Sequence, residues 1–77
     1  TTTLQYDLPE AENVSLVIYN IQGQEIVVLD AGFKMAGRYS LDWDARDRRG
    51  QSMNTGVYFC RLNAGEYSQT IKMLYLK

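Results

Sequence analysis

The chain has 77 residues, of which 45% are hydrophobic and 22% charged, and these values fit one small folded domain. It carries 8 Lys and Arg residues against 9 Asp and Glu residues, and the net charge of −1 argues against nucleic-acid binding, which needs a basic surface. The absence of histidine excludes imidazole bases and ligands, and the single cysteine excludes an internal disulfide.

Short strands are predicted along most of the chain, because β-forming residues alternate with polar ones and glycines separate the runs. The expected strands cover residues 3–8, 14–19, 26–29, 39–44, 51–53, 56–63 and 67–76. Pro9 should end the first strand, and Asn63-Ala64-Gly65-Glu66 predicts a hairpin between the last two. No window shows a helical repeat. The pattern therefore predicts an all-β, immunoglobulin-like antiparallel β-sandwich of about seven strands.

The central side chains of the core are expected on two strands. Tyr58 and Cys60 have the Tyr-x-Cys spacing of a tyrosine corner, in which the phenol hydroxyl binds nearby backbone. Trp43 would be the large central side chain. No base or basic cluster accompanies Cys60, so we expect a buried apolar thiol rather than a nucleophile. Most of the six tyrosines should be core or half-buried rather than a carbohydrate platform.

One group of carboxylates could in principle bind a cation. Asp42 and Asp44 share a strand face, and Asp47 follows closely. Arg46 occupies the third alternate position and the glycine of a calcium loop is missing, so the pattern fails the test for such a loop. We expect Asp44 and Asp47 to cap backbone amides instead. With no paired nucleophile and no room for a deep cleft, we predict no catalytic residue, no metal and no cofactor, and hence no enzyme.

The last strand is apolar at both parities from Ile71 to Leu76, apart from Lys72. In a strand with one solvated face, apolar and polar side chains should alternate. Because they do not alternate here, both faces of this strand should be covered by other residues or by a partner. Two interpretations follow. Either this is a central strand buried on both sides, or one face docks against a partner through added-strand pairing.

Residues 8–29 and 36–77 carry motifs found in known families. The motifs are V-x-L-x-I-Y-N-x-x-G-x-x-[IV], G-x-x-x-L-x-W-D-x-R-D-x-x-G, S/T-G-V-Y-F-x-R-L and a terminal K-M-L-x-L-K. In this order they resemble the C-terminal sorting domain of the type IX secretion system. They equally resemble the immunoglobulin-like domain of the flagellar hook-capping protein. One departure is Ala45, which replaces the glycine common after Trp-Asp.

The resemblance implies a function without catalysis. Residues 1–77 would be a single immunoglobulin-like domain, the C-terminal module of a larger secreted bacterial protein. It would serve as a sorting and cell-surface anchoring domain, reached through the periplasm and outer membrane. Its partners would be the type IX outer-membrane machinery, the upstream cargo domain of the same chain and, through the terminal strand, a second copy. The implied partner-binding residues are Lys72, Met73, Leu74, Tyr75, Leu76 and Lys77. The alternative is a structural spacer or accessory module beside an extracellular enzyme domain or in an extracellular assembly.

Overall fold

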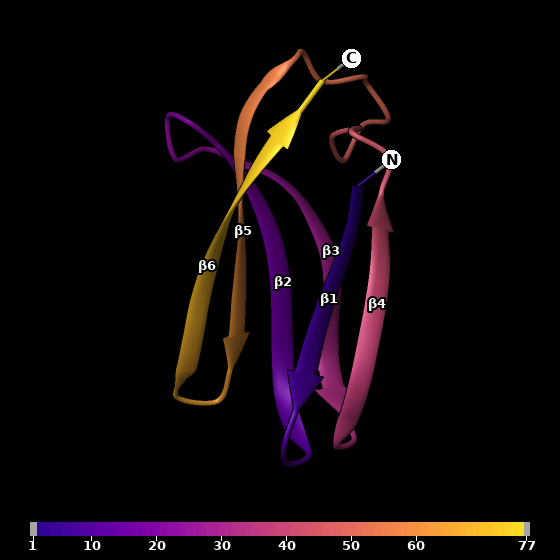
Figure 1. The fold of residues 1–77 in the computed structure, drawn as a ribbon, viewed down its shortest axis with the longest axis vertical. Helices are drawn as coiled ribbons and strands as arrows, with labels where there is room; N and C mark the ends of the chain where they lie inside the picture. Colours follow the sequence, from indigo (N-terminus) through magenta and orange to yellow (C-terminus); the bar gives the residue numbers. More distant parts are fainter. Residues whose placement is uncertain (1, 77) are drawn as a thin grey trace.

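The computed structural model describes residues 2–76, which form an all-β fold of six antiparallel strands (Figure 1). The strands are β1 (Thr2–Leu8), β2 (Glu12–Asn20), β3 (Glu25–Lys34), β4 (Gly37–Trp43), β5 (Gly56–Ala64) and β6 (Tyr67–Tyr75). No helix among these residues is long and apolar enough to cross a membrane. The immunoglobulin-like antiparallel architecture predicted from the alternation is thereby confirmed.

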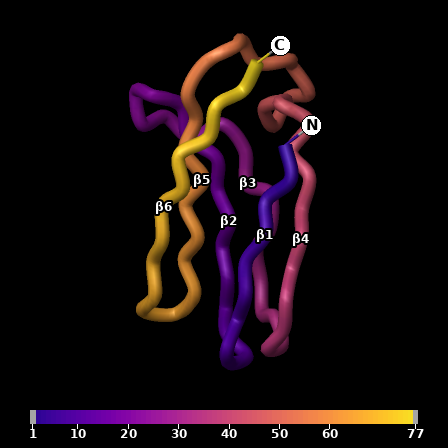
Figure 2. Tube along the Cα trace, in the orientation of Figure 1, coloured from indigo at the N-terminus to yellow at the C-terminus, as the bar shows by residue number. Residues whose placement is uncertain are grey.

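The strands divide unequally between two sheets. One sheet has only β1 and β4, whereas the other has four strands in the order β3-β2-β5-β6. Figure 2 traces the chain as it passes between the sheets, with the connection from β4 to β5 running over one end of the sandwich. The unequal division leaves β3 and β6 as the two edges of the larger sheet.

The structure has one strand fewer than the sequence predicts. Residues 51–53 contribute only an isolated bridge between Arg46 and Ser52, because they belong to the connection from β4 to β5 and not to a sheet. Conversely, β3 is longer than expected and continues to Lys34. Its second half pairs with β2 in spite of polar and glycine residues, after a register shift between Leu16 and Val17.

The core lies between the two sheets and explains the alternation. β1, β2 and β5 bury alternate residues in it, whereas β3, β4 and β6 each bury one, and Trp43, Ile18 and Cys60 are the largest fully buried side chains. Trp43 packs edge-on against Tyr58, with their ring centroids 5.2 Å apart. The expected positions of Trp43 and Cys60 are confirmed.

Two turn predictions are also confirmed. β1 ends at Leu8, directly before Pro9. The hairpin between β5 and β6 is tight, and Gly65 at its tip has a φ of +60°, which suits glycine because left-handed backbone disfavours a side chain.

Candidate interaction surface on the last strand

The last strand, β6, is an edge strand. It pairs with β5 along nine residues in unbroken register and has no neighbour on its other side in the described structure. The interpretation of this segment as a central strand is therefore wrong. The opposite edge, β3, is interrupted by two register shifts, and irregularity of that kind discourages further strand pairing. The edge of β6 is regular and can accept another strand.

The side chains of β6 alternate between the core and solvent. Met73 is buried, and Tyr75 packs against the same core, 6.1 Å from Trp43 between ring centroids. Leu74 points outward with 70% of its surface exposed, and Leu76 beyond the strand is 82% exposed. The sequence-predicted partner-binding residues thus fall into two groups.

The outward group contains Lys72, Leu74 and Leu76, which are accessible to a partner. Met73 and Tyr75 form the inward group, which positions the strand on the core. Lys77 lies outside the described residues.

Apolar side chains of β5 and β2 extend the outward surface. Val57 lies opposite Leu74 in the β-ladder, and Phe59 lies opposite Lys72. Directly opposite residues of antiparallel strands point to the same face, so Val57, Phe59 and Leu74 share the outer face. Tyr19 lies opposite Phe59 on β2 and continues the row. We call Tyr19, Val57, Phe59, Lys72 and Leu74 the outer patch.

A pocket of about 270 Å³ adjoins this patch. It is lined by Tyr19, Asn20, Ile21, Gly23, Phe59, Arg61 and Thr70. Ile21 is 71% exposed, and neither Arg61 nor Lys72 forms an ion pair with another described residue. The surface is therefore apolar and aromatic with two available cations, a composition that suits protein contact.

Sequence reasoning missed the contribution of Tyr19, Ile21 and Phe59 to this surface. A signal was present, because β5 is apolar at both parities from Val57 to Cys60, as β6 is near its end. Only the register between the strands shows that the two runs lie beside each other.

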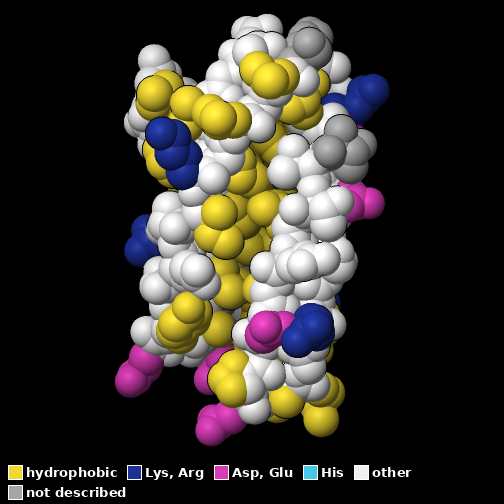
Figure 3. Space-filling model, in the orientation of Figure 1, with side chains coloured by type: hydrophobic (Ala, Val, Ile, Leu, Met, Phe, Trp, Pro, Cys, Tyr) yellow, Lys and Arg dark blue, Asp and Glu magenta, His cyan; other side chains and the backbone are white. Residues whose placement is uncertain are grey.

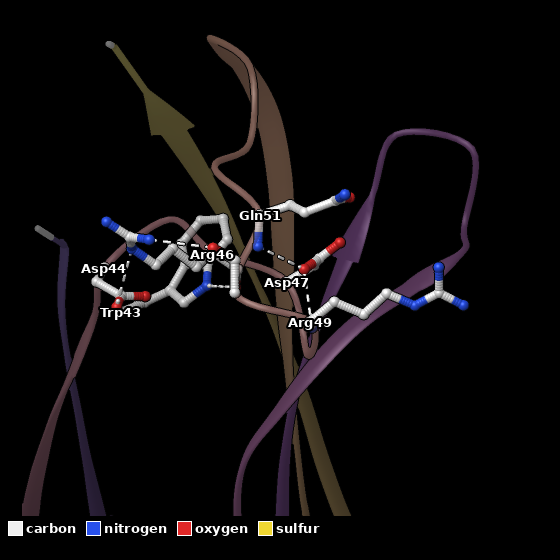
Figure 4. Close-up of polar contacts among 7 residues, drawn as sticks. Trp43, Asp44, Arg46, Asp47, Arg49 and Gln51 are labelled. Atoms are coloured by element: carbon white, nitrogen blue, oxygen red, sulfur yellow. Dashed lines mark hydrogen bonds and ion pairs between the residues drawn. The ribbon is translucent and has the colours of Figure 1, made fainter.

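The carboxylates near the β4–β5 connection do not converge. Asp42 accepts a hydrogen bond from the Thr3 hydroxyl at 2.8 Å. Asp47 accepts backbone N–H bonds from Arg49 at 2.9 Å and Gln51 at 3.0 Å, so its predicted capping role is confirmed (Figure 4).

The predicted capping role of Asp44 is wrong. Its carboxylate lies beside the Arg46 guanidinium, with 3.6 Å between Oδ2 and Nε. Asp44 follows the end of β4 and stays exposed at the surface, so its carboxylate reaches the side chain two residues on rather than backbone amides. No group of three metal-binding side chains occurs among residues 2–76.

The Tyr58 and Cys60 side chains behave as structural groups. The Tyr58 hydroxyl donates a hydrogen bond to the backbone carbonyl of Asn54, as predicted for a tyrosine corner. Cys60 is 1% exposed, and loss of hydration on burial raises the pKa of its thiol to about 11. The thiolate is the reactive form, so this thiol is poorly suited to nucleophilic chemistry near neutral pH.

The tyrosines are distributed largely as predicted. Tyr6 and Tyr58 are buried, and Tyr19, Tyr39 and Tyr75 are half-buried. Tyr67 is the exception, with 57% of its surface exposed. A row of exposed rings, as carbohydrate stacking would need, is not formed by the described residues.

Comparison with known proteins gives consistent results. A family model described as the FlgD Ig-like domain matches residues 1–68. The crystal structure of FlgD from P. aeruginosa is similar, with a TM-score of 0.72 and 25% sequence identity. The similarity covers 91% of this chain and 55% of that one, so this chain spans about half the length of that protein. No significant match is found among curated proteins.

Proposed function

The chain belongs to the FlgD Ig-like domain family and is a non-catalytic immunoglobulin-like module. We propose that this module directs protein sorting. It is a sorting and cell-surface anchoring domain of a secreted bacterial protein, read by the outer-membrane machinery of type IX secretion. The upstream cargo domain of the same chain is the protein carried. The destination is the extracellular medium or the cell surface, reached through the periplasm and the outer membrane.

One observation supports this proposal above the others, namely the exposure of apolar side chains on an open strand edge. Leu74 and Leu76 are 70% and 82% exposed beside an edge without bulge or proline. Natural proteins usually protect such edges, because an exposed edge pairs with other chains. A receptor that adds its own strand to β6 would use this feature directly.

The outer patch provides the side-chain part of the recognition. Added-strand pairing supplies backbone hydrogen bonds, which depend little on sequence, whereas the side chains beside the strand select the partner. Leu74 supplies apolar contact and Lys72 orients the partner by charge. Met73 and Tyr75 contribute indirectly, because their burial holds the strand against the core.

The test is a secretion assay in a bacterium with a type IX system. A fluorescent reporter with an ordinary signal peptide carries residues 1–77 at its C-terminus. The variant Leu74→Ser with Leu76→Ser removes both exposed apolar side chains and leaves the core intact. We expect the parent fusion outside the cell and the variant in the periplasm.

The matched control is Phe33→Ser with Met35→Ser, because these side chains are 63% and 67% exposed and lie away from β6. This control should be exported like the parent. Circular dichroism of each purified domain verifies folding. Export of the folded Leu74→Ser, Leu76→Ser variant at the parental level would refute the sorting role of β6.

A second candidate function is a structural spacer or accessory module beside an extracellular enzyme domain or in an extracellular assembly. The similarity to FlgD favours it, because there a chain of this kind makes up part of a longer protein. In that case the parent fusion itself stays in the periplasm while folded. We also propose that two copies of the chain can pair through the β6 edge. Sedimentation of the 77-residue chain measures whether this homodimer forms.

A further inference from the structure

A groove runs along the molecule between β1 and β6. Figure 3 shows apolar side chains as a stripe along the long axis, flanked on both sides by polar and backbone atoms. The groove arises because the two-stranded sheet is too narrow to cover a four-stranded one. A third strand beside β1 would complete the cover.

The inward face of β6 shows which side chains lack that cover. Tyr67, Gln69 and Ile71 lie opposite Ala64, Leu62 and Cys60 in the ladder, and these three partners are buried. Opposite residues share a face, so the β6 residues also point inward. Nevertheless Tyr67 is 57% exposed and Ile71 37% exposed.

The backbone of β1 provides the second wall of the groove. β1 pairs with β4 in seven consecutive positions without a register shift, and its other edge has no partner in the described structure. The strand contains no proline, so the unpaired edge keeps its N–H and C=O groups for another strand.

One end of the groove is a pocket with acidic side chains. It has a volume of about 370 Å³ and is lined by Asp7, Leu8, Pro9, Glu10, Glu12, Ala64 and Tyr67. Asp7 pairs with Arg38, whereas Glu10 and Glu12 have no cation beside them among residues 2–76. An apolar floor with carboxylates at the rim suits a Lys or Arg side chain, whose stem is apolar and whose head is charged.

We propose that this groove binds an extended segment of a partner polypeptide as a seventh strand paired with β1. Alternate apolar side chains of the segment cover Ile71 and the core, and a Lys or Arg of the segment enters the acidic pocket. The groove lies on the inner side of β6, so this binding is separate from recognition at the outer patch.

The test uses the 77-residue chain and a synthetic peptide. The probe is a blocked peptide of the order Lys-Thr-Val-Thr-Val-Thr-Val-Ser, in which Lys and the three Val residues share one face, and amide chemical shifts are followed by NMR during titration. We expect saturable shifts in β1 and on the inward residues of β6. A peptide with Glu in place of Lys should bind about fivefold more weakly, since a rim charge pair contributes about 1 kcal/mol. A peptide with Pro at its fourth and fifth positions should not bind, because Pro there removes an N–H donor whichever edge of the peptide strand faces β1.

Two matched variants locate the binding site on β6. Ile71→Lys places a charge in the groove, whereas Leu74→Lys places the same charge on the outer face of the same strand. We expect loss of peptide binding in the first variant and parental binding in the second, with both spectra otherwise folded. Export depends on the opposite face, so parental export by Ile71→Lys with loss of export in Leu74→Lys separates this proposal from the sorting function.

Any of the following results would overturn the proposal. One is the lack of saturable binding of the probe at millimolar concentration. Another is equal loss of binding in the two variants, or shifts confined to the outer patch. The last is a concentration-dependent dimer that Ile71→Lys abolishes, which would assign the groove to a second copy of the chain.

Discussion

The Tyr58 hydroxyl lies 2.7 Å from the backbone carbonyl oxygen of Asn54 and donates a hydrogen bond to it. This bond holds the β4–β5 connection against the start of β5. The Tyr58 ring meanwhile packs edge-on against Trp43. One side chain therefore joins the core to the segment that closes one end of the sandwich.

Replacement of this tyrosine tests the bond alone. Tyr58→Phe keeps the ring packing and should lower the free energy of unfolding by about 1 kcal/mol, the net value of one such hydrogen bond. Urea denaturation measures the change. Tyr67→Phe is the control, because Tyr67 is exposed and its hydroxyl donates a hydrogen bond to the exposed Gln69 side chain, so its effect should be negligible. Equal effects of the two changes would contradict a special role for Tyr58.

Ala45 is the one non-glycine residue with a left-handed backbone among residues 2–76, with φ at 59° and 2% exposure. Ala45→Gly should relieve about 1 kcal/mol of backbone strain. It also removes a buried methyl group worth about 0.8 kcal/mol and adds freedom to the unfolded chain. These effects nearly cancel, so we expect a change within about 1 kcal/mol.

Ala45→Val has no such compensation. A β-branched side chain is strained in the left-handed region and overfills a buried site, so we expect a loss of about 2 kcal/mol or more. Thermal unfolding of both variants measures the contrast. If valine were tolerated as well as glycine, the left-handed conformation at this position would be wrong.

Asp47 and Asp44 are predicted to contribute differently to the stability of the fold. Asp47 accepts two backbone N–H bonds, and Asp47→Ala should cost about 1 kcal/mol or more, as loss of a capping side chain does. Asp44 forms an exposed ion pair with Arg46, and Asp44→Ala should change stability by less than about 0.5 kcal/mol. Chemical denaturation in parallel checks the order. A larger cost for Asp44 would contradict the hydrogen bonding at this turn.

Burial of the Cys60 thiol should make the free energy of unfolding depend on pH. Its pKa is about 11 in the folded chain and near 9 when exposed, so the buried neutral thiol contributes stability that is fully present below pH 9. That contribution is lost as pH rises towards 11, because the unfolded chain ionises first. The free energy of unfolding should therefore fall between pH 9 and 11 more steeply in the parent than in Cys60→Ala. Parallel pH profiles for the two proteins would refute this.

Much of the fold could be predicted because it depends on local chemistry. The alternation in β1, the stop at Pro9 and the turn at Gly65 are each determined by a few neighbouring residues. The extent of β3 could not be predicted in this way. Gly32 is held in β3 by pairing with Val14 of β2, and a pairing partner does not appear in the local pattern.

The candidate site was accessible to sequence reasoning only in part. The break in alternation after Lys72 indicated a strand with two apolar faces. Whether its neighbours lie on one side or both depends on sheet order, which residues far apart in the chain decide together. For the same reason the residues of the outer patch on β2 and β5 were not found.

The sequence by itself determined the class of the domain, its turns, its buried Trp43 and Cys60, and the unusual last strand. These features follow from residue type and spacing, which act over a few residues. Only the tertiary structure decided that β6 is an open edge and that the sheets contain two and four strands. It also decided that β1 and β6 border a groove with an acidic end. The physical reason is that burial and strand pairing are settled by contacts between distant segments, which compete for the same core.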